Sequence, residues 1–365
     1  MPDEKKIYDM TELACMNQKE MAEWVAGKGY PEFRGKQLFR WIHQGADFSE
    51  MTNLPREMRD DLSRTATARS VSVITSRRSA LDGTVKFLFG LMDGNCVEGV
   101  LMKYHFGYSL CISTQVGCRM GCRFCASTLD GCVRNLSAGE MLCQILEANR
   151  FLAPEGGRVS HVVLMGSGEP FDNYSNVVRF LRLLREEDGV RISLRNVSLS
   201  TCGIIPGILD FSKEGLPVTL CISLHAPNDS VRAKLMPVAK LYPVHDILDA
   251  CRKYIRATGR RIIFEYALTD GINSDNECAV ELCRLLRGMQ CHVNLIPLND
   301  VAERNLRGVS ENTVQSFMKT LKDGNISVTR RREMGDDIDG ACGQLRRAFI
   351  SNRNGEKNEQ KVLSN

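Results

Sequence analysis

The sequence predicts an α/β fold in which parallel strands wind into a full or partial barrel, preceded by a small helical domain and a β-hairpin region. Apolar residues recur every three or four positions over the first seventy residues, which indicates helices. Alternating strands separated by Asp-Gly pairs follow, and such pairs are typical of hairpin turns. From residue 108 onward, short apolar runs alternate with helical stretches, which is the pattern of repeated strand–helix units.

Six segments after residue 108 have the length and composition of buried strands. They are YSLCIST, VSHVVLM, NVSLST, PVTLCIS, RIIFEYAL and CHVNLIP. Amphipathic stretches between them predict helices over Ser137–Leu152, Asn173–Glu187, Val244–Ala257 and Asp275–Arg287. In parallel barrels the chemistry lies at the carboxyl ends of the strands, so functional residues are expected there.

The changes of pattern divide the chain into four parts. Residues 1–70 are expected to form a helical accessory domain, 71–104 a β extension, 105–350 the α/β core, and 351–365 a polar, disordered tail. The strands expected in the β extension are SVSVITSRRSA, TVKFLFGLM and NCVEGVLMKY.

Composition is that of an ordinary globular protein, with 43% apolar and 25% charged residues. The net charge of +4 permits nucleic-acid binding without demanding it. Charged residues open the chain with no apolar signal region behind them, and no run of eighteen apolar residues exists, so we expect a cytoplasmic protein that does not span a membrane. Fifteen cysteines in such a protein indicate metal or redox chemistry, or small buried hydrophobes.

The stretch GCRMGCRFCAS brings Cys118, Cys122 and Cys125 together directly after the first barrel strand. Its glycines favour a loop over a regular helix. A structural zinc site normally takes four ligands, and an iron–sulfur cube usually takes four cysteines. Three cysteines would hold three irons and leave the fourth open for a substrate. We favour this open [4Fe-4S] cluster over zinc or over incidental thiols.

Small polar residues follow the other strands at their carboxyl ends. Such side chains could orient a ribose, a carboxylate or an adenine edge, although each alone is more often structural. The residues are Gly168 and Glu169 after the second strand, Ser200 after the third, Ser223, Leu224 and His225 after the fourth, and Asn299 after the sixth.

The cysteine spacing and its place after a first barrel strand resemble the radical S-adenosylmethionine (SAM) enzymes. The resemblance implies a partial (β/α)6 barrel whose open iron is chelated by SAM. It also implies that the turn at Gly168 and Glu169 binds the SAM amino group.

Three longer stretches, YSLCISTQVGCRMGCRFC, ISLHAPND and GDDIDGACGQL, resemble the RlmN-type adenine-C2 RNA methyltransferases. The N-terminal YPEFRGKQLFRWI is also similar to the helical accessory domain of that family. The resemblance implies that Cys342 is methylated on sulfur, that Cys111 resolves the covalent intermediate by forming a disulfide, and that Glu98 accepts the ring proton. It implies 23S rRNA and tRNA as substrates.

Other readings remain open at this stage. A Cfr-type enzyme, which methylates adenine carbon 8 and confers antibiotic resistance, shares the catalytic set. An activase acting on a protein glycine would need the cluster but not the pair Cys111 and Cys342, and an iron–sulfur RNA-binding protein would not consume SAM. We expect a monomer supplied by a flavodoxin- or ferredoxin-like electron donor.

Basic and aromatic residues interleave in KGYPEFRGKQLFRWIH, which includes Arg34, Lys36 and Arg40. Such a stretch can bind RNA through phosphates and stacked bases. The alternative is a small helical domain with an aromatic core and a solvated charged face.

Overall fold

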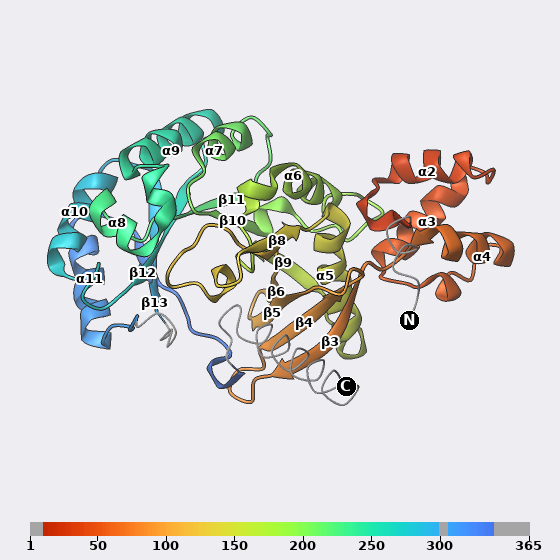
Figure 1. The fold of residues 1–365 in the computed structure, drawn as a ribbon, viewed down its shortest axis with the longest axis horizontal. Coiled ribbons are helices and arrows are strands. Elements are labelled where there is room, and N and C mark those ends of the chain that lie inside the picture. Colours follow the sequence, from red (N-terminus) through yellow and green to blue (C-terminus); the bar gives the residue numbers. More distant parts are fainter. Residues whose placement is uncertain (1–9, 299–305, 339–365) are drawn as a thin grey trace, which may run out of the picture.

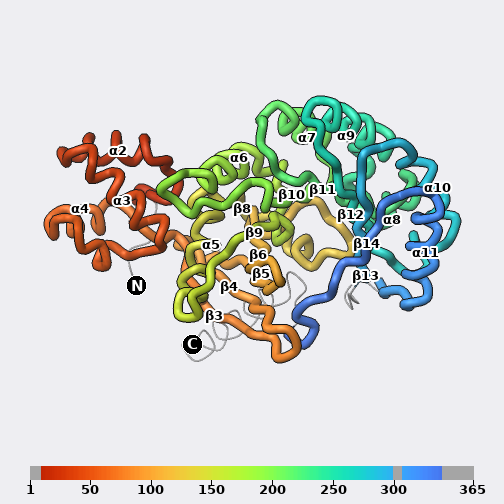
Figure 2. The backbone as a smooth tube through the Cα atoms, turned by 180° about the vertical axis from the view of Figure 1, so that it is seen from behind, coloured from red at the N-terminus to blue at the C-terminus, as the bar shows by residue number. Residues whose placement is uncertain are grey.

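The computed structural model describes residues 10–298 and 306–338 (Figure 1). A ten-stranded sheet forms the centre of the molecule, in the spatial order β14-β13-β12-β11-β10-β9-β6-β5-β4-β3. The sheet is curved and open, and helices cover its outer side (Figures 1 and 2). This arrangement confirms the predicted α/β fold with a partial barrel.

The barrel is formed by seven parallel strands of this sheet, β6 and β9 to β14. Their bounds are β6 Gly107–Cys111, β9 Val159–Leu164, β10 Val197–Thr201, β11 Thr219–Ser223, β12 Ile262–Leu268, β13 Cys291–Pro297 and β14 Val328–Arg330. The first six confirm the six strands expected from the sequence. The short β14 was not predicted, because its few residues run directly into a series of arginines.

The three strands expected in the β extension are present as β3 (Val71–Arg78), β4 (Val85–Leu91) and β5 (Cys96–Tyr104). Each pairs antiparallel with the next, and β5 pairs antiparallel with β6. The extension therefore continues the barrel sheet instead of forming a separate layer. The division at residues 70, 104 and 350 stays a prediction.

The bounds of the core helices are α5 Ala138–Leu152, α6 Tyr174–Leu183, α7 Ile205–Phe211, α8 Asp229–Leu235, α9 Val244–Thr258, α10 Asn276–Leu286 and α11 Glu311–Asp323. Of these, α5, α9 and α10 follow their predicted ranges closely, and α6 ends four residues earlier than predicted; no ranges were predicted for α7, α8 and α11. Ser137 and Glu140 form a capping box that fixes the start of α5. Strand residues facing these helices, such as Leu110, Val162, Leu199 and Ile222, are fully buried. Nowhere in 10–298 or 306–338 does a helix have the length and apolar character needed to span a membrane.

Helices α2 (Gln18–Gly27), α3 (Phe33–His43) and α4 (Arg56–Thr65) form a lobe beside the barrel (Figure 2). Asp188, which follows α6, ties this lobe to the core. Its carboxylate lies 3.2 Å from Lys36 Nζ and 2.7 Å from Arg40 Nη2, and it accepts a hydrogen bond from Gln18. Two of the basic residues expected to meet RNA are thus used in holding the lobe to the core.

Candidate active site

The inner face of the sheet carries Glu98 and Cys111, two of the predicted catalytic residues, and the predicted serines Ser200 and Ser223. Side chains alternate between the two faces of a strand, so the register decides which residues share a face. Cys111 pairs with Val100, which is two residues from Glu98. Ser200 pairs with Cys221, which is two residues before Ser223. The polar and thiol side chains that the register places on this face include Lys86, Glu98, Cys111, Ser200, Cys221, Ser223, Glu265 and Asn294.

The three clustered cysteines lie in a loop that crosses the inner side of the sheet (yellow in Figure 1). This loop, residues 118–131, is closed by the hairpin of β7 (Gln115–Gly117) and β8 (Cys132–Asn135). The Cys118 N–H donates to the Gly131 carbonyl at 2.8 Å. Gly117 has a φ of +78°, and a Cβ atom there would lie 2.0 Å from that carbonyl oxygen. Only glycine fits this position, so the loop is held closed by the chain itself.

The interior of the cluster loop is also ordered by hydrogen bonds. The Thr128 hydroxyl lies 3.1 Å from the Cys122 carbonyl oxygen and 2.9 Å from that of Cys125. Cys122 packs against Cys202 and Leu235, which follow β10 and end α8. The loop is thereby seated against the carboxyl ends of the barrel strands.

Burial keeps the thiols of Cys118 and Cys122 neutral when no metal is bound. Burial, more than any other cause, raises the pKa of Cys118 to about 12, and it raises that of Cys122 further. In the described part of the chain, no three His, Cys, Asp or Glu side chains converge on a single ion. The donors that the loop offers are the three sulfurs of Cys118, Cys122 and Cys125, and the hydrogen bonds of the loop fix the course of its backbone. This soft donor set fits an iron–sulfur cluster.

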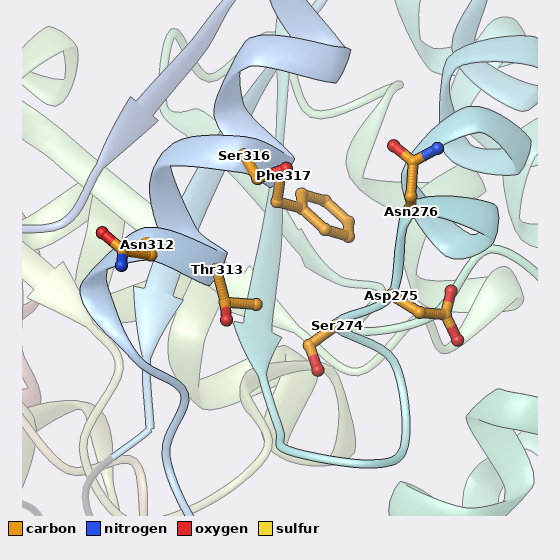
Figure 3. Close-up of a pocket in the computed structure, with 7 residues that line it drawn as sticks. All are labelled: Ser274, Asp275, Asn276, Asn312, Thr313, Ser316 and Phe317. Atoms are coloured by element: carbon orange, nitrogen blue, oxygen red, sulfur yellow. The ribbon is translucent and has the colours of Figure 1, made fainter.

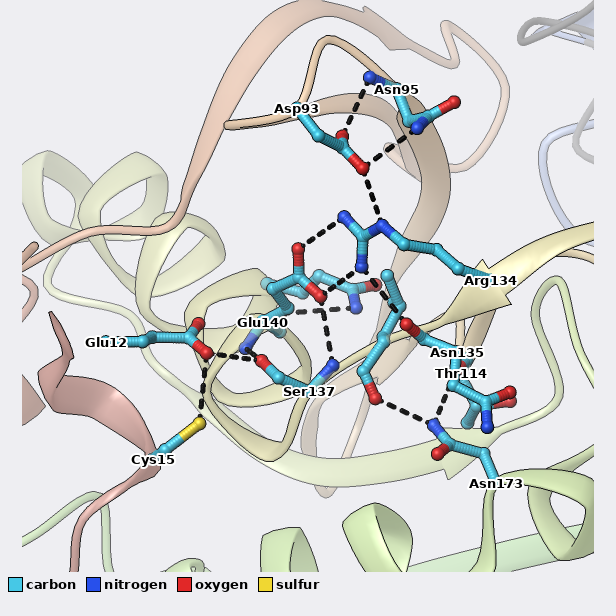
Figure 4. A network of polar contacts seen from close by, with 12 residues as sticks. Glu12, Cys15, Asp93, Asn95, Thr114, Arg134, Asn135, Ser137, Glu140 and Asn173 are labelled. Atoms are coloured by element: carbon cyan, nitrogen blue, oxygen red, sulfur yellow. Dashed lines mark hydrogen bonds and ion pairs between the residues drawn. The ribbon is translucent and has the colours of Figure 1, made fainter. Parts of the chain in front are cut away.

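Arg134 fixes the β8 arm of the loop to the rest of the core (Figure 4). Its guanidinium lies 2.5 Å from Asp93, in the β4–β5 turn, and 2.7 Å from Glu140 at the start of α5. The network continues to the N-terminal lobe, since Ser137 donates to Glu12 at 2.6 Å. These ion pairs and hydrogen bonds therefore connect the cluster loop to both the β extension and the lobe.

The glycine-rich turn after β9 packs closely on the segment that leads into the cysteines. Gly168 has a φ of +112°, and a Cβ atom there would lie 2.6 Å from Thr114 Oγ1. The Thr114 N–H donates to the Ser167 carbonyl at 2.8 Å. The turn therefore needs glycine both for its conformation and for this close approach.

Glu169 is buried, and its carboxylate accepts two backbone hydrogen bonds. One comes from Phe171 at 3.0 Å and the other from Cys202 at 2.7 Å. Burial raises the pKa of this carboxyl group above its ordinary value. These contacts join the turn to the end of β10. That Glu169 binds the SAM amino group stays a prediction.

The residues expected after β10 and β11 come together in the structure. Ser200 Oγ lies 3.2 Å from Ser223 Oγ. The N–H groups of Leu224 and His225 both donate to the Glu265 carbonyl. Neighbouring strand ends thus present two hydroxyls side by side.

His225 is fixed by both its backbone and its ring. Its φ is +56°, and its Nδ1 accepts a hydrogen bond from the Ala267 N–H at 2.9 Å, which leaves the proton on Nε2. Burial, followed by the charge of Arg232, lowers its pKa to about 3, so the ring is neutral. The ring packs edge-on against Phe124 of the cluster loop, with centroids 4.7 Å apart. His225 therefore links the end of β11 to the cluster loop.

Glu98 lies on the inner face of β5 and is 4% exposed. Its carboxylate lies 3.5 Å from the ammonium group of Lys86, which is fully buried on β4. Lys86 was not singled out from the sequence. Its signal is a lone cation in the otherwise apolar strand TVKFLFGLM.

Cys111 ends β6 on the same face and is 5% exposed. It belongs to a small apolar cluster with Val100 and Met102, against which Met334 packs. Directly after Met334, the Gly335 N–H donates to Asp82 at 2.9 Å in the β3–β4 turn. The segment that leads to Cys342 is thus anchored beside Cys111. Cys342 itself, and Asn299, lie outside the described residues.

A polar pocket lies between the start of α10 and α11, outside the barrel (Figure 3). It is lined by Ser274, Asp275, Asn276, Asn312, Thr313, Ser316 and Phe317. None of the predicted site residues lines it.

Comparison with known proteins agrees with this arrangement. Residues 112–286 match the model of the radical SAM superfamily, and residues 11–68 match that of the ribosomal RNA large subunit methyltransferase N-terminal domain. Two similar proteins bear the name probable dual-specificity RNA methyltransferase RlmN. The one from Lachnospira eligens is 50% identical over 93% of this chain and 97% of its own. The one from Clostridium acetobutylicum is 49% identical over 95% of this chain and 100% of its own.

A solved structure has the same fold. The crystal structure of a radical SAM methyltransferase from Sphaerobacter thermophilus superposes with a TM-score of 0.89 at 40% identity, covering 92% of this chain and 98% of that one. With near-complete coverage of its relatives and the cysteine loop in place, the chain belongs to the RlmN family within the radical SAM superfamily.

Proposed function

We propose that the protein methylates carbon 2 of adenine in 23S rRNA, and also in tRNA, with a [4Fe-4S] cluster and SAM as cofactors. The observation that carries this proposal is the inner face of the sheet, which holds Glu98 and Cys111 beside the segment leading to Cys342. Similarity to the RlmN relatives along nearly the whole chain supports it.

Cys118, Cys122 and Cys125 would hold the cluster, with the hairpin of β7 and β8 keeping the loop closed around it. When bound, the cluster and SAM supply a radical route that an electron-poor ring carbon requires. The hydroxyls of Ser200 and Ser223, with Leu224 and His225 beside them, would orient SAM at the strand ends. Gly168 and Glu169 would shape the turn that receives its amino group, and Asn299 would complete this set.

The two remaining thiols would act on the substrate. Cys342 would carry the methyl group, and Cys111 would attack the Cys342 sulfur, forming a disulfide and releasing the methylated base. Glu98 would accept the ring proton. The ammonium group of Lys86 lies 3.5 Å from this carboxylate.

Carbon 2 is favoured over carbon 8 by the match of the N-terminal lobe to the RlmN-type domain. The fourteen cysteines in the described ranges are all free thiols, which agrees with a reducing, cytoplasmic setting. We further propose a monomer that receives electrons from a flavodoxin- or ferredoxin-like donor.

The test is anaerobic turnover of the reconstituted protein with methyl-labelled SAM and an adenine-containing 23S rRNA fragment. Digested nucleosides are compared by mass spectrometry with both methyladenosine standards. The expected product is 2-methyladenosine, lost in Cys342→Ala and retained in Cys291→Ala, a control thiol at the opposite end of the barrel. 8-Methyladenosine would instead place the protein with the Cfr-type enzymes. Deoxyadenosine without any methylated base would refute the proposal that adenine in 23S rRNA is the substrate.

A further inference from the structure

Arg232, in the short helix α8, is fully buried. Its guanidinium donates only to backbone carbonyls. The acceptors are Leu224 at 3.1 Å, Tyr242 at 3.1 Å, Cys202 at 2.6 Å and Ser223 at 3.4 Å. No ion pair among the described residues includes this arginine. A buried cation is costly unless an anion compensates it, and carbonyl dipoles compensate it only in part.

The charge of Asp229 acts on Arg232, but the two side chains form no ion pair among the described residues. Asp229, one turn earlier in α8, uses its carboxylate to accept the Val244 N–H at 2.7 Å at the start of α9. Glu169 is occupied by the N–H groups of Phe171 and Cys202. Asp229 therefore compensates this cation from beyond ion-pair distance, and a second, closer anion would compensate it further.

The cluster loop lies directly beside this cation. Cys202, whose carbonyl accepts the shortest hydrogen bond from Arg232, packs with Cys122 and with Leu235 of α8. Cys202 therefore contacts the guanidinium through its carbonyl and contacts Cys122 through its side chain.

We propose that Arg232 is the countercharge of the iron–sulfur cluster and raises its reduction potential. A four-iron cluster held by three thiolates is an anion, and it gains one further negative charge on one-electron reduction. A buried cation beside it stabilises the reduced form more than the oxidised form. The inference rests on the cluster that the proposed function requires.

Arg232 also positions the ends of β10 and β11 through its hydrogen bonds, and this role must be separated from its charge. Arg232→Gln removes the charge and most of the hydrogen bonds. Arg232→Lys keeps the charge but loses the planar fork of donors. Arg260→Gln is a matched control, because Arg260 also donates to a backbone carbonyl, that of Val218, but at the opposite end of β11.

The experiment is an anaerobic redox titration of the reconstituted proteins without SAM or RNA, with the reduced cluster followed by electron paramagnetic resonance. At the solution potential where the wild type is half reduced, Arg232→Gln should show a reduced-to-oxidised ratio lower by about tenfold or more, which corresponds to about 59 mV for one electron. Arg232→Lys should stay within about threefold of the wild type, and Arg260→Gln should match it.

An unchanged ratio in Arg232→Gln would overturn the proposal. So would a fall in Arg232→Lys as large as that in Arg232→Gln, because the hydrogen bonds and not the charge would then matter. If Arg232→Gln takes up no cluster, the test rests on Arg232→Lys. A reduced-to-oxidised ratio outside about threefold of the wild type, or failure of this variant to assemble a cluster, counts against the proposal. Iron and sulfide analysis of the wild type comes first, since a wild type without a cluster would refute the proposed function itself.

Discussion

Gly117→Ala should open the cluster loop, while Gly131→Ala should leave it closed. Both glycines have positive φ, +78° and +68°, so alanine at either position meets the same left-handed backbone penalty of about 1 kcal/mol. At Gly131 a Cβ atom meets nothing within 4 Å. At Gly117 it would lie 2.0 Å from the Gly131 carbonyl oxygen, so the two arms of the hairpin must move apart.

That movement breaks the 2.8 Å hydrogen bond from the Cys118 N–H to the same carbonyl. Leaving such a buried pair unsatisfied costs about 1–3 kcal/mol in addition to the backbone penalty. We therefore expect Gly117→Ala to destabilise the closed loop by about 3 kcal/mol and Gly131→Ala by about 1 kcal/mol. The difference of about 2 kcal/mol makes the loop open roughly 30 times more often.

Two measurements check this difference. Native-state hydrogen exchange reports the opening of the loop through the Cys118 N–H, which should exchange faster in Gly117→Ala. Iron content after anaerobic reconstitution should fall in Gly117→Ala and stay near the wild type in Gly131→Ala. Equal exchange and equal iron in the two variants would refute the reasoning, because the clash with the Gly131 carbonyl would then have no energetic effect.

Four further predictions follow from contacts described above. Lys86→Met removes the ammonium group that lies 3.5 Å from the buried Glu98 carboxylate and should lower the free energy of unfolding by about 3 kcal/mol in urea denaturation; a loss below about 1 kcal/mol would contradict a tight pair. Alanine at Cys118, Cys122 or Cys125 should abolish iron binding, whereas Cys132→Ser, in the neighbouring β8, should retain it by iron analysis. Burial lowers the pKa of His43 to about 4, so the folded protein resists protonating it. The free energy of unfolding should therefore fall by about 1.4 kcal/mol per pH unit as the pH drops from about 6.5 towards 4. In His43→Leu this contribution to the pH dependence, which corresponds to the uptake of one proton on unfolding, should be absent. Asp188→Ala releases Gln18, Lys36 and Arg40 and should speed limited proteolysis between the N-terminal lobe and the core, with Asp210→Ala, whose ion pair is local to α7, as the control.

The architecture could be predicted because each barrel strand and helix has its own periodicity. The expected helix over Ser137–Leu152 differs from α5 by one residue, since Ser137 is the cap that precedes it. The same local signals could not show that β5 pairs with β6 and so joins the extension to the barrel. Strand pairing depends on contacts between segments and not on the pattern within one segment.

The residues of the site could be predicted from the sequence, but the hydrogen bonds and contacts between them could not. The spacing of the cysteines identifies Cys118, Cys122 and Cys125. The positions at strand ends identify Ser200 and Ser223. Glu169 shows the limit, because nothing in its sequence context reveals that two backbone N–H groups occupy its carboxylate.

Buried cations were missed altogether. Arg232 and Lys86 are charged side chains of the kind that are mostly exposed, yet both are fully buried. Lys86 stands out only as a lone cation in an apolar strand, and the sequence around Arg232 carries no signal of its burial. Burial of an arginine depends on which carbonyls the fold brings around it.

The continuity of β3, β4, β5 and β6 has a consequence for how the chain folds. Each of these strands pairs with its immediate neighbour along the sequence, so the pairings close only short loops and cost little chain entropy. The parallel partner of β6 arrives much later, after α5, and its pairing closes a far longer loop. We therefore expect the antiparallel strands to form first and to serve as the template on which the barrel grows in chain order during synthesis. The cysteine loop follows β6 at once, so its three thiols emerge beside a sheet that is already begun.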